Sequence, residues 1–219
     1  TITVMEKIGH FLDDAVAKIY KKLKKEGFTK SAASPQIAEL LSMEKVLRKA
    51  SKKWDGGYTI AGLLGHGESF VFRDPAGIRP AFYYDDDEIL VVASERPAIQ
   101  TVFNVAFENI LELPPGCALL TKKSGAVKLS QIQQAVAPKS CSFERIYFSR
   151  PDSIIGGKTV YSYRKKLGEQ LAKENTIDVD VVIPVPDSGV PAALGYSQKS
   201  KIPFELGIIR NHYVGRTFI

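Results

Sequence analysis

A short polar turn, Asp187-Ser188-Gly189, is the part of this sequence best suited to bind a ligand. The apolar residues 181–186 before it are typical of a buried strand, and a helical pattern follows. Backbone N–H groups at a helix N-terminus lack partners, so this turn could hold a phosphate or a phosphate-bound metal such as Mg²⁺. In the ordinary alternative, Asp187 or Ser188 only caps the helix, and the residues leave both interpretations open.

The last ten residues form a basic and aromatic segment that contains Arg210, Tyr213 and Arg216. Two arginines around a tyrosine suit a loop that closes over a phosphorylated substrate, because guanidinium groups bind phosphate through paired hydrogen bonds. An exposed surface loop is the simpler interpretation. The sequence stops there without a closing helix or strand, so we expect a piece of a larger enzyme.

The cysteines and histidines offer no complete site. Cys117 and Cys141 are the only cysteines, which is too few for a disulfide framework or a four-ligand metal site, and we expect a reduced, cytoplasmic setting. The three histidines show no metal-ligand spacing. Thr1 could act as an N-terminal nucleophile, but it leads directly into an expected helix.

The net charge of +6 does not indicate a nucleic-acid partner. Residues 1–53 contain twelve Lys or Arg and six Asp or Glu, which accounts for the whole excess. Five of these lysines lie in residues 18–25, at the end of an expected helix, where cations complement the helix dipole. No apolar run reaches the roughly 18 residues of a spanning helix, so we expect no membrane partner either.

The elements of the first part are predicted by periodicity and by their end signals. A capping box at Thr3 and Glu6 and a stop at Gly27 bound a first helix, and Ser34-Pro35 indicates the start of a second. Short β-rich runs follow at 58–64, 69–73, 81–84 and 89–93, which we expect to form an antiparallel meander. A short helix after Ser94 and a hairpin over 106–129, turning at Ser124-Gly125, complete this part.

The second part alternates strands and helices. Residues 131–140 lack a clear period, and beyond them we predict strands at 146–148, 180–185 and 204–209 and helices at 160–174 and 191–199. Such alternation implies a parallel sheet with ligands at the carboxyl ends of its strands. The fold class is therefore α+β followed by the start of an α/β domain.

Several blocks resemble the glutamine phosphoribosylpyrophosphate amidotransferases. Arg73-Asp74-Pro75-Ala76-Gly77-Ile78-Arg79-Pro80, Ala93-Ser94-Glu95 and Pro114-Pro115-Gly116 are similar to the later part of that family's glutaminase domain. Residues 144–153, 181–189 and 211–219 look like the opening of its phosphoribosyltransferase domain. The resemblance implies two domains: residues 1–137 as the latter part of an N-terminal-nucleophile (αββα) glutaminase, and 138–219 as the first βαβ units of a type I phosphoribosyltransferase.

The family resemblance implies the first committed step of purine biosynthesis. Glutamine is hydrolysed in one domain, and its ammonia displaces pyrophosphate from C1 of Mg²⁺-bound phosphoribosylpyrophosphate in the other, giving 5-phosphoribosylamine. The partners implied are these substrates, purine-nucleotide inhibitors and other copies of the same protein, as a homo-oligomer.

The resemblance also implies roles for individual residues. Asp187 to Gly189 would face pyrophosphate, with the Ser188 hydroxyl on the Mg²⁺ side. Arg210, Tyr213 and Arg216 would begin the loop that covers the substrate, although many members have lysine where Arg210 stands. Cys141 falls where some members have one ligand of a [4Fe–4S] cluster.

Parts of the family's machinery are missing from this sequence. The N-terminal catalytic cysteine, the glutamine-binding arginine and Asn-Gly pair, and the Asp-Asp-Ser phosphoribosylpyrophosphate motif are absent. We therefore expect an internal piece, engineered or natural, that is inactive alone and associates through an uncovered apolar face. The alternatives are a catalytically dead regulatory or assembly module with half a nucleotide site, and a salvage phosphoribosyltransferase with an unrelated extension.

Overall fold

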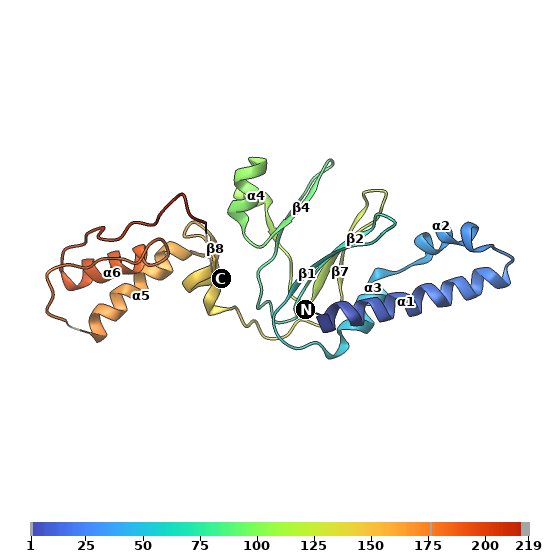
Figure 1. The fold of residues 1–219 in the computed structure, drawn as a ribbon, viewed down its shortest axis with the longest axis horizontal. Coiled ribbons are helices and arrows are strands. Elements are labelled where there is room, and N and C mark those ends of the chain that lie inside the picture. Colours follow the sequence, from blue (N-terminus) through green and yellow to red (C-terminus); the bar gives the residue numbers. More distant parts are fainter. Residues whose placement is uncertain (1, 176, 216–219) are drawn as a thin grey trace. The chain divides into compact units, whose positions relative to one another are not determined.

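A computed structural model describes residues 2–175 and 177–215, and it divides the chain into two compact units (Figure 1). The first unit runs to Ser94 and resumes over Glu108–Ser140, and the second comprises Glu95–Phe107 and the chain from Cys141 onward. The chain thus passes between units three times. A single division at 137/138 does not describe this arrangement, because residues 95–107 leave the first unit and return to it.

Three helices form one layer of the first unit. The first helix, α1, ends where Gly27 takes φ +90° and Phe28 donates its N–H to the Leu23 carbonyl, as predicted. It already includes Ile2, so Thr3 lies inside the helix and the predicted capping box is wrong. The helices are α1 (Ile2–Lys25), α2 (Lys30–Leu40) and α3 (Met43–Ala50), and α3 continues in a 3₁₀ turn, η1 (Ser51–Lys53).

The predicted start of the second helix at Ser34-Pro35 is also wrong. The helix α2 begins five residues earlier because the Thr29 hydroxyl accepts a hydrogen bond from the Ala32 N–H, and Pro35 lies within it. A second cap follows at once, since the Ser42 hydroxyl accepts from the Lys45 N–H at the start of α3. Local capping oxygens therefore set these boundaries.

Two antiparallel sheets form the other layers of the first unit. The first has the order β1-β2-β6-β7 and the second the order β4-β3-β5. Neighbouring β2 and β3 belong to different sheets, so the predicted continuous meander is wrong. The strands are β1 (Thr59–Leu63), β2 (Ser69–Arg73), β3 (Phe82–Asp85), β4 (Leu90–Ala93), β5 (Leu111–Glu112), β6 (Cys117–Thr121) and β7 (Val127–Gln131), and a short 3₁₀ turn, η2 (Phe107–Asn109), precedes β5.

Successive side chains of β2 and β6 point alternately to the two faces of the first sheet. Phe70, Phe72 and Ala118 face the helices, where they pack with Leu47 and the apolar stripe of α1. Their neighbours Val71, Cys117 and Leu119 face the second sheet and pack with Ala81 and Leu113. This period of two fixes a helix–sheet–sheet stack with two hydrophobic layers.

The second unit is built mainly from helices. The helix predicted at 160–174 is confirmed with the same bounds, and the one predicted at 191–199 is confirmed and is one residue longer at each end. Residues 144–148 form a π-helical turn, so the strand predicted at 146–148 is wrong. The elements are α4 (Arg96–Phe103), η3 (Glu144–Phe148), the hairpin strands β8 (Ile154–Ile155) and β9 (Lys158–Thr159), α5 (Val160–Glu174) and α6 (Val190–Ser200).

The helical turn at 144–148 is held by the neighbouring helix α5. Arg164, which is buried, donates to the carbonyl oxygens of Arg145 and Ser149 at 2.8 Å each. Glu144 is buried in the same turn and accepts a hydrogen bond from the Ser149 hydroxyl. The two bonds from Arg164 satisfy backbone carbonyls that a strand would have paired with another strand.

The predicted strands 180–185 and 204–209 meet only at one parallel bridge, between Val182 and Phe204. Val182 donates to the Pro203 carbonyl and accepts from the Glu205 N–H. The direction of pairing is parallel as expected, but within the described residues no parallel sheet forms. Among all the residues that the structure describes, no helix is both long enough and apolar enough to cross a membrane.

Glycines let α5 and α6 cross closely. A Cβ on Gly168 would lie 1.8 Å from the Ala192 carbonyl oxygen, and one on Gly195 would lie 2.0 Å from the Lys165 carbonyl oxygen. Each helix therefore presents a glycine to the other's backbone. This crossing fixes the start of α6, and with it the polar turn that precedes the helix.

Candidate functional site

The Asp187-Ser188-Gly189 turn leads directly into α6. Gly189 occupies the N-cap position, and its N–H donates to the Val185 carbonyl at 3.1 Å. A Cβ on Gly189 would lie 2.5 Å from that carbonyl oxygen, so the turn requires glycine. The peptide bond between Pro186 and Asp187 is cis.

No side-chain oxygen caps α6 among the described residues. The capping role that the sequence left open for Asp187 or Ser188 is therefore not what the geometry shows. Pro191 occupies the first turn of the helix and has no N–H to satisfy. The Ser188 hydroxyl is half-buried beside a helix N-terminus, where backbone dipoles favour a bound anion.

Arg210 lies against this turn. Its Nη1 is 3.3 Å from Oδ2 of Asp187, and the two side chains are 51% and 65% exposed. An ion pair this exposed contributes little to stability, so a phosphate could displace either partner at small cost. The structure thus brings together two residues that are 23 positions apart in the sequence.

The rest of the closing segment is less closely engaged. Tyr213 is fully exposed, and its N–H donates to the Asn211 side chain at 3.0 Å, which forms a local turn. Arg216 lies outside the described residues. Tyr213 therefore does not contact the Asp187–Gly189 turn, and its predicted role remains a prediction.

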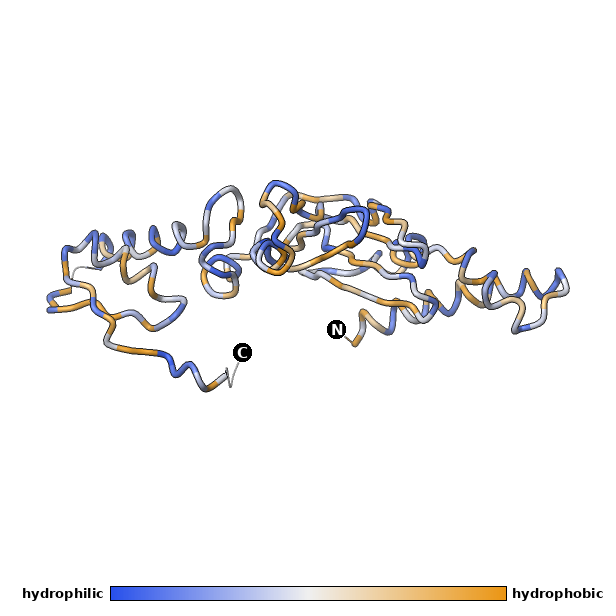
Figure 2. The backbone as a smooth tube through the Cα atoms, turned by 90° about the horizontal axis from the view of Figure 1, so that it is seen from above, coloured by the Kyte–Doolittle hydropathy of each residue, from blue (hydrophilic) through white to orange (hydrophobic). Residues whose placement is uncertain are grey.

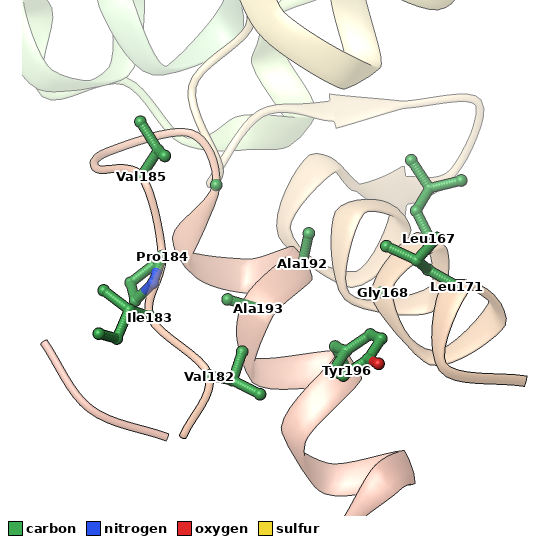
Figure 3. A pocket seen from close by; sticks show the side chains of 11 residues that line it. Leu167, Gly168, Leu171, Val182, Ile183, Pro184, Val185, Ala192, Ala193 and Tyr196 are labelled. Atoms are coloured by element: carbon green, nitrogen blue, oxygen red, sulfur yellow. The ribbon is translucent and has the colours of Figure 1, made fainter. Parts of the chain in front are cut away.

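A hollow of about 450 Å³ lies behind the turn, between residues 182–185 and the helices α5 and α6 (Figure 3). Its lining is almost wholly apolar, and Figure 3 shows Leu167 and Leu171 on α5 and Ala192, Ala193 and Tyr196 on α6 around it. A phosphate site needs polar donors, which this lining lacks. The hollow is therefore a gap in a hydrophobic layer, and the candidate phosphate site is the turn at its rim.

Ser188 fits the requirements of Mg²⁺. Magnesium in phosphate sites keeps several waters and takes only one or two protein oxygens, which the Ser188 hydroxyl and the Asp187 carboxylate can supply. The described residues contain no cluster of three or more His, Cys, Asp or Glu, so a protein-only metal cage is not present among them.

The cysteines do not fit an iron–sulfur cluster by themselves. Such a cluster takes four cysteine thiolates, and the chain has two cysteines, one in each unit. Cys141 is half-buried and unbonded to another sulfur. Cys117 is buried, its thiol donates to the Gln131 side chain at 3.2 Å, and burial raises its pKa.

Glu95, which belongs to one of the family-like sequence blocks, holds two segments of the second unit together. One oxygen of Glu95 accepts from the Arg150 N–H at 2.8 Å and also from the Ser153 hydroxyl. This links the start of the 95–107 segment to the loop before β8. The two sequence blocks that contain these residues, Ala93-Ser94-Glu95 and 144–153, could be recognised from the sequence. The contact between them could not.

The known proteins that this chain resembles in sequence are amidophosphoribosyltransferases. No family model matches the sequence. An amidophosphoribosyltransferase of Rhizobium etli is 42% identical over 174 residues, which cover 78% of this chain and 34% of that protein. The amidophosphoribosyltransferase of Methanothermobacter thermautotrophicus is 36% identical over 216 residues, with 92% and 44% covered.

Solved structures give the same result. The chain matches a glutamine phosphoribosylpyrophosphate amidotransferase from B. subtilis, complexed with ADP and GMP, with a TM-score of 0.68 and 34% identity over 93% of this chain and 45% of that one. The chain spans about a third to a half of the length of these relatives. Over most of its length it is therefore homologous to the amidophosphoribosyltransferases, and it corresponds to less than half of such a protein.

Proposed function

We propose that this chain is part of an amidophosphoribosyltransferase and that its Asp187-Ser188-Gly189 turn binds the pyrophosphate side of phosphoribosylpyrophosphate. The observation that carries the proposal is the uncapped start of α6 with Arg210 beside it. The parent protein would use glutamine-derived ammonia to convert phosphoribosylpyrophosphate into 5-phosphoribosylamine, in purine biosynthesis. Homology over most of the chain supports this activity.

Each group at the turn has a separate task in this proposal. The positive end of the α6 dipole stabilises the charge of the phosphate oxygens, whereas the N–H groups of Gly189 and Val190 already donate to the carbonyls of Val185 and Asp187. The Ser188 hydroxyl lies on the side of a phosphate-bound Mg²⁺, which when present would neutralise the pyrophosphate as it leaves. Arg210 exchanges Asp187 for a phosphate oxygen and so holds the substrate in place.

The first unit belongs, in this proposal, to the glutaminase side of the parent protein. Its helix–sheet–sheet stack would support that domain's active site. Cys117 cannot be the glutamine nucleophile, because its buried thiol has a raised pKa and stays protonated at neutral pH. The catalytic thiol would come from another part of the parent protein.

The proposal predicts binding without turnover for the chain alone. We expect no glutaminase activity and no ammonia-dependent formation of phosphoribosylamine, with weak Mg²⁺-dependent binding of phosphoribosylpyrophosphate by calorimetry. Turnover with ammonia by the purified chain would contradict the assignment of this chain as an incomplete catalytic unit.

The turn itself is tested by Ser188→Ala in the parent enzyme, where ammonia-dependent turnover can be measured. We expect KM for phosphoribosylpyrophosphate to rise and its Mg²⁺ dependence to weaken, because one Mg²⁺-side oxygen is removed. Ser142→Ala is the matched control, since Ser142 is exposed and lies away from the turn in the sequence. Equal KM values for both variants and the wild type would refute the role of Ser188.

A further inference from the structure

A second polar hollow lies in the second unit, away from the residues assigned to the turn. Its volume is about 220 Å³, and the hairpin β8–β9 and the starts of η3 and α5 enclose it. Its lining residues are Arg145, Ile155, Gly156, Lys158, Val160 and Tyr163. None of them takes part in the function proposed above.

The polar groups that line this hollow are all able to donate, and none is acidic. Arg145 and Lys158 carry positive charges, and Tyr163 has a hydroxyl group. The Arg145 guanidinium lies 5.8 Å from the centre of the Tyr163 ring, a cation–π contact that orients it beside the hollow. The lining therefore has the chemistry of an anion site.

Within the described part of the chain, neither Arg145 nor Lys158 forms an ion pair with an acidic side chain. Nearby arginines differ in this respect. Arg164 donates to two backbone carbonyls, and Arg150 pairs with Asp152 at 2.9 Å. Two unneutralised cations beside one hollow favour a negatively charged occupant.

The helix start beside the hollow does not supply the attraction. The first N–H groups of α5 are already bonded: Val160 donates to the Ser153 carbonyl and Tyr161 to the Pro151 carbonyl, at 2.9 and 2.8 Å. The Ser162 N–H donates to the Thr159 hydroxyl. An anion in the hollow would therefore be held by the side chains of Arg145, Lys158 and Tyr163.

Gly156 keeps space open beside the guanidinium. It takes φ +61° in the turn of the β8–β9 hairpin, and a Cβ there would lie 3.3 Å from Nη2 of Arg145. Any other residue would be strained in this conformation and would crowd the arginine. The hairpin turn thus leaves a face of the guanidinium accessible.

We propose that this hollow is a binding site for a phosphate group, separate from the Asp187-Ser188-Gly189 turn. Arg145 binds two phosphate oxygens through its fork of N–H donors, Lys158 contributes a point charge, and the Tyr163 hydroxyl donates a third contact. The volume exceeds that of one tetrahedral anion, so the phosphate can belong to a small phosphate monoester. The site gives the chain a second place to sense phosphorylated metabolites.

The test is an NMR titration of the full chain with inorganic phosphate and, separately, with ribose 5-phosphate, at low ionic strength. We expect saturable shifts centred on the Gly156 and Gly157 amides. Lys158→Met is the main variant because Lys158 is exposed and its loss does not disturb the core, and it should weaken binding roughly tenfold. Tyr163→Phe should weaken binding several-fold while keeping the ring under Arg145.

Two control variants decide between explanations. Lys166→Met removes the same charge from an exposed part of α5 outside the hollow and should leave the affinity within about twofold. Ser188→Ala probes the separate turn and should have no effect on the Gly156 shifts. Equal losses with Lys158→Met and Lys166→Met, loss with Ser188→Ala, or no saturable binding to the wild type would each overturn the proposal. Tighter binding of ribose 5-phosphate would identify a monoester as the ligand, and equal binding would show that only the phosphate group is recognised.

Discussion

Asp74 has no exposed surface, and four backbone N–H groups donate to its carboxylate. Three of these donors, Ala76, Ile78 and Arg79, come from the loop that follows β2, and the fourth comes from Tyr58. The neighbouring Arg73 is buried as well and donates to the carbonyls of Arg79, Gly77 and Leu113 and to Glu112. Arg73 and Asp74, which begin the family block, therefore hold the loop that follows β2 in place.

At this scale we predict that Asp74→Asn destabilises the first unit by about 2 kcal/mol, because hydrogen bonds to a charged acceptor are lost and an amide N–H₂ faces backbone donors. Urea unfolding followed by the fluorescence of Trp54, the only tryptophan, reports on this unit. Asp86→Asn is the control, since Asp86 accepts hydrogen bonds from two backbone N–H groups in an exposed turn. Its replacement should lower the free energy of unfolding by much less. Equal effects would show that burial of Asp74 is unimportant.

Glu44 connects the helix α3 to the strand β7, which lies more than 80 residues later in the sequence. It lies on α3 and accepts from Lys128 at 2.7 Å and from Ser130, both on β7, and it pairs with Arg48 on its own helix. The Lys128 hydrogen bond, followed by that of Arg48, lowers the Glu44 pKa to about 2. This carboxylate therefore fastens the helical layer to the edge strand of the first sheet.

The depressed pKa gives a pH-dependent prediction. The folded-state pKa lies below the unfolded value of about 4.5, so the stabilisation by Glu44 is present above pH 4.5 and is lost as the pH falls toward 2. At pH 7 we expect Glu44→Gln to cost about 1 kcal/mol, since the carboxylate is partly exposed, with the difference shrinking below pH 4.5. Urea unfolding followed by Trp54 fluorescence at several pH values measures this difference in the free energy of unfolding between the variant and the wild type. A difference that stays constant down to pH 3 would contradict this assignment.

The crossing of α5 and α6 gives a second prediction for the elements. Gly168→Ala places a methyl group 1.8 Å from a backbone oxygen of α6, so the helices must separate, and we expect a loss of about 3 kcal/mol. Gly9→Ala is the matched control, because a Cβ on Gly9 meets nothing within 4 Å inside α1. That change should stabilise by about 0.5–1 kcal/mol. Thermal unfolding by circular dichroism distinguishes the two, and a neutral Gly168→Ala would rule out the close crossing.

At the scale of the whole molecule, apolar side chains are left exposed along residues 177–185 and 206–209. Val185, Leu206 and Ile209 are 70%, 62% and 78% exposed. Figure 2 shows the hydrophobic run 206–209 in orange, just before the hydrophilic residues 210–212. Exposed apolar runs in extended segments with few backbone partners favour association with other chains.

We therefore predict that the chain alone self-associates. Sedimentation equilibrium should give a mass above 24.1 kDa that rises with concentration. Replacing Leu206 and Ile209 by lysine should shift the equilibrium toward the monomer, whereas Ile2→Lys, at an equally exposed residue of the first unit, should not. A mass of 24.1 kDa at all concentrations would refute the prediction.

The amino-acid sequence by itself determined the resemblance to the amidophosphoribosyltransferases and the features that depend on near neighbours. Gly27 ends α1, Gly125 takes φ +88° at the predicted hairpin turn, and Thr159 caps the helix predicted at 160–174. Each of these rests on backbone conformation or hydrogen bonds within five residues. Such features depend little on the rest of the chain, although the wrong helix starts predicted at Thr3 and Ser34 show that a local signal can be overruled where the helix begins earlier.

Only the tertiary structure decided the pairings between distant segments. β2 pairs with β6 instead of β3, residues 144–148 become helical under Arg164, and Arg210 reaches Asp187. Residues 95–107 join the second unit, where Glu95 holds the 150–153 loop. Many segments of similar composition could occupy each of these places, and the choice depends on which set buries its apolar faces and satisfies its polar groups together.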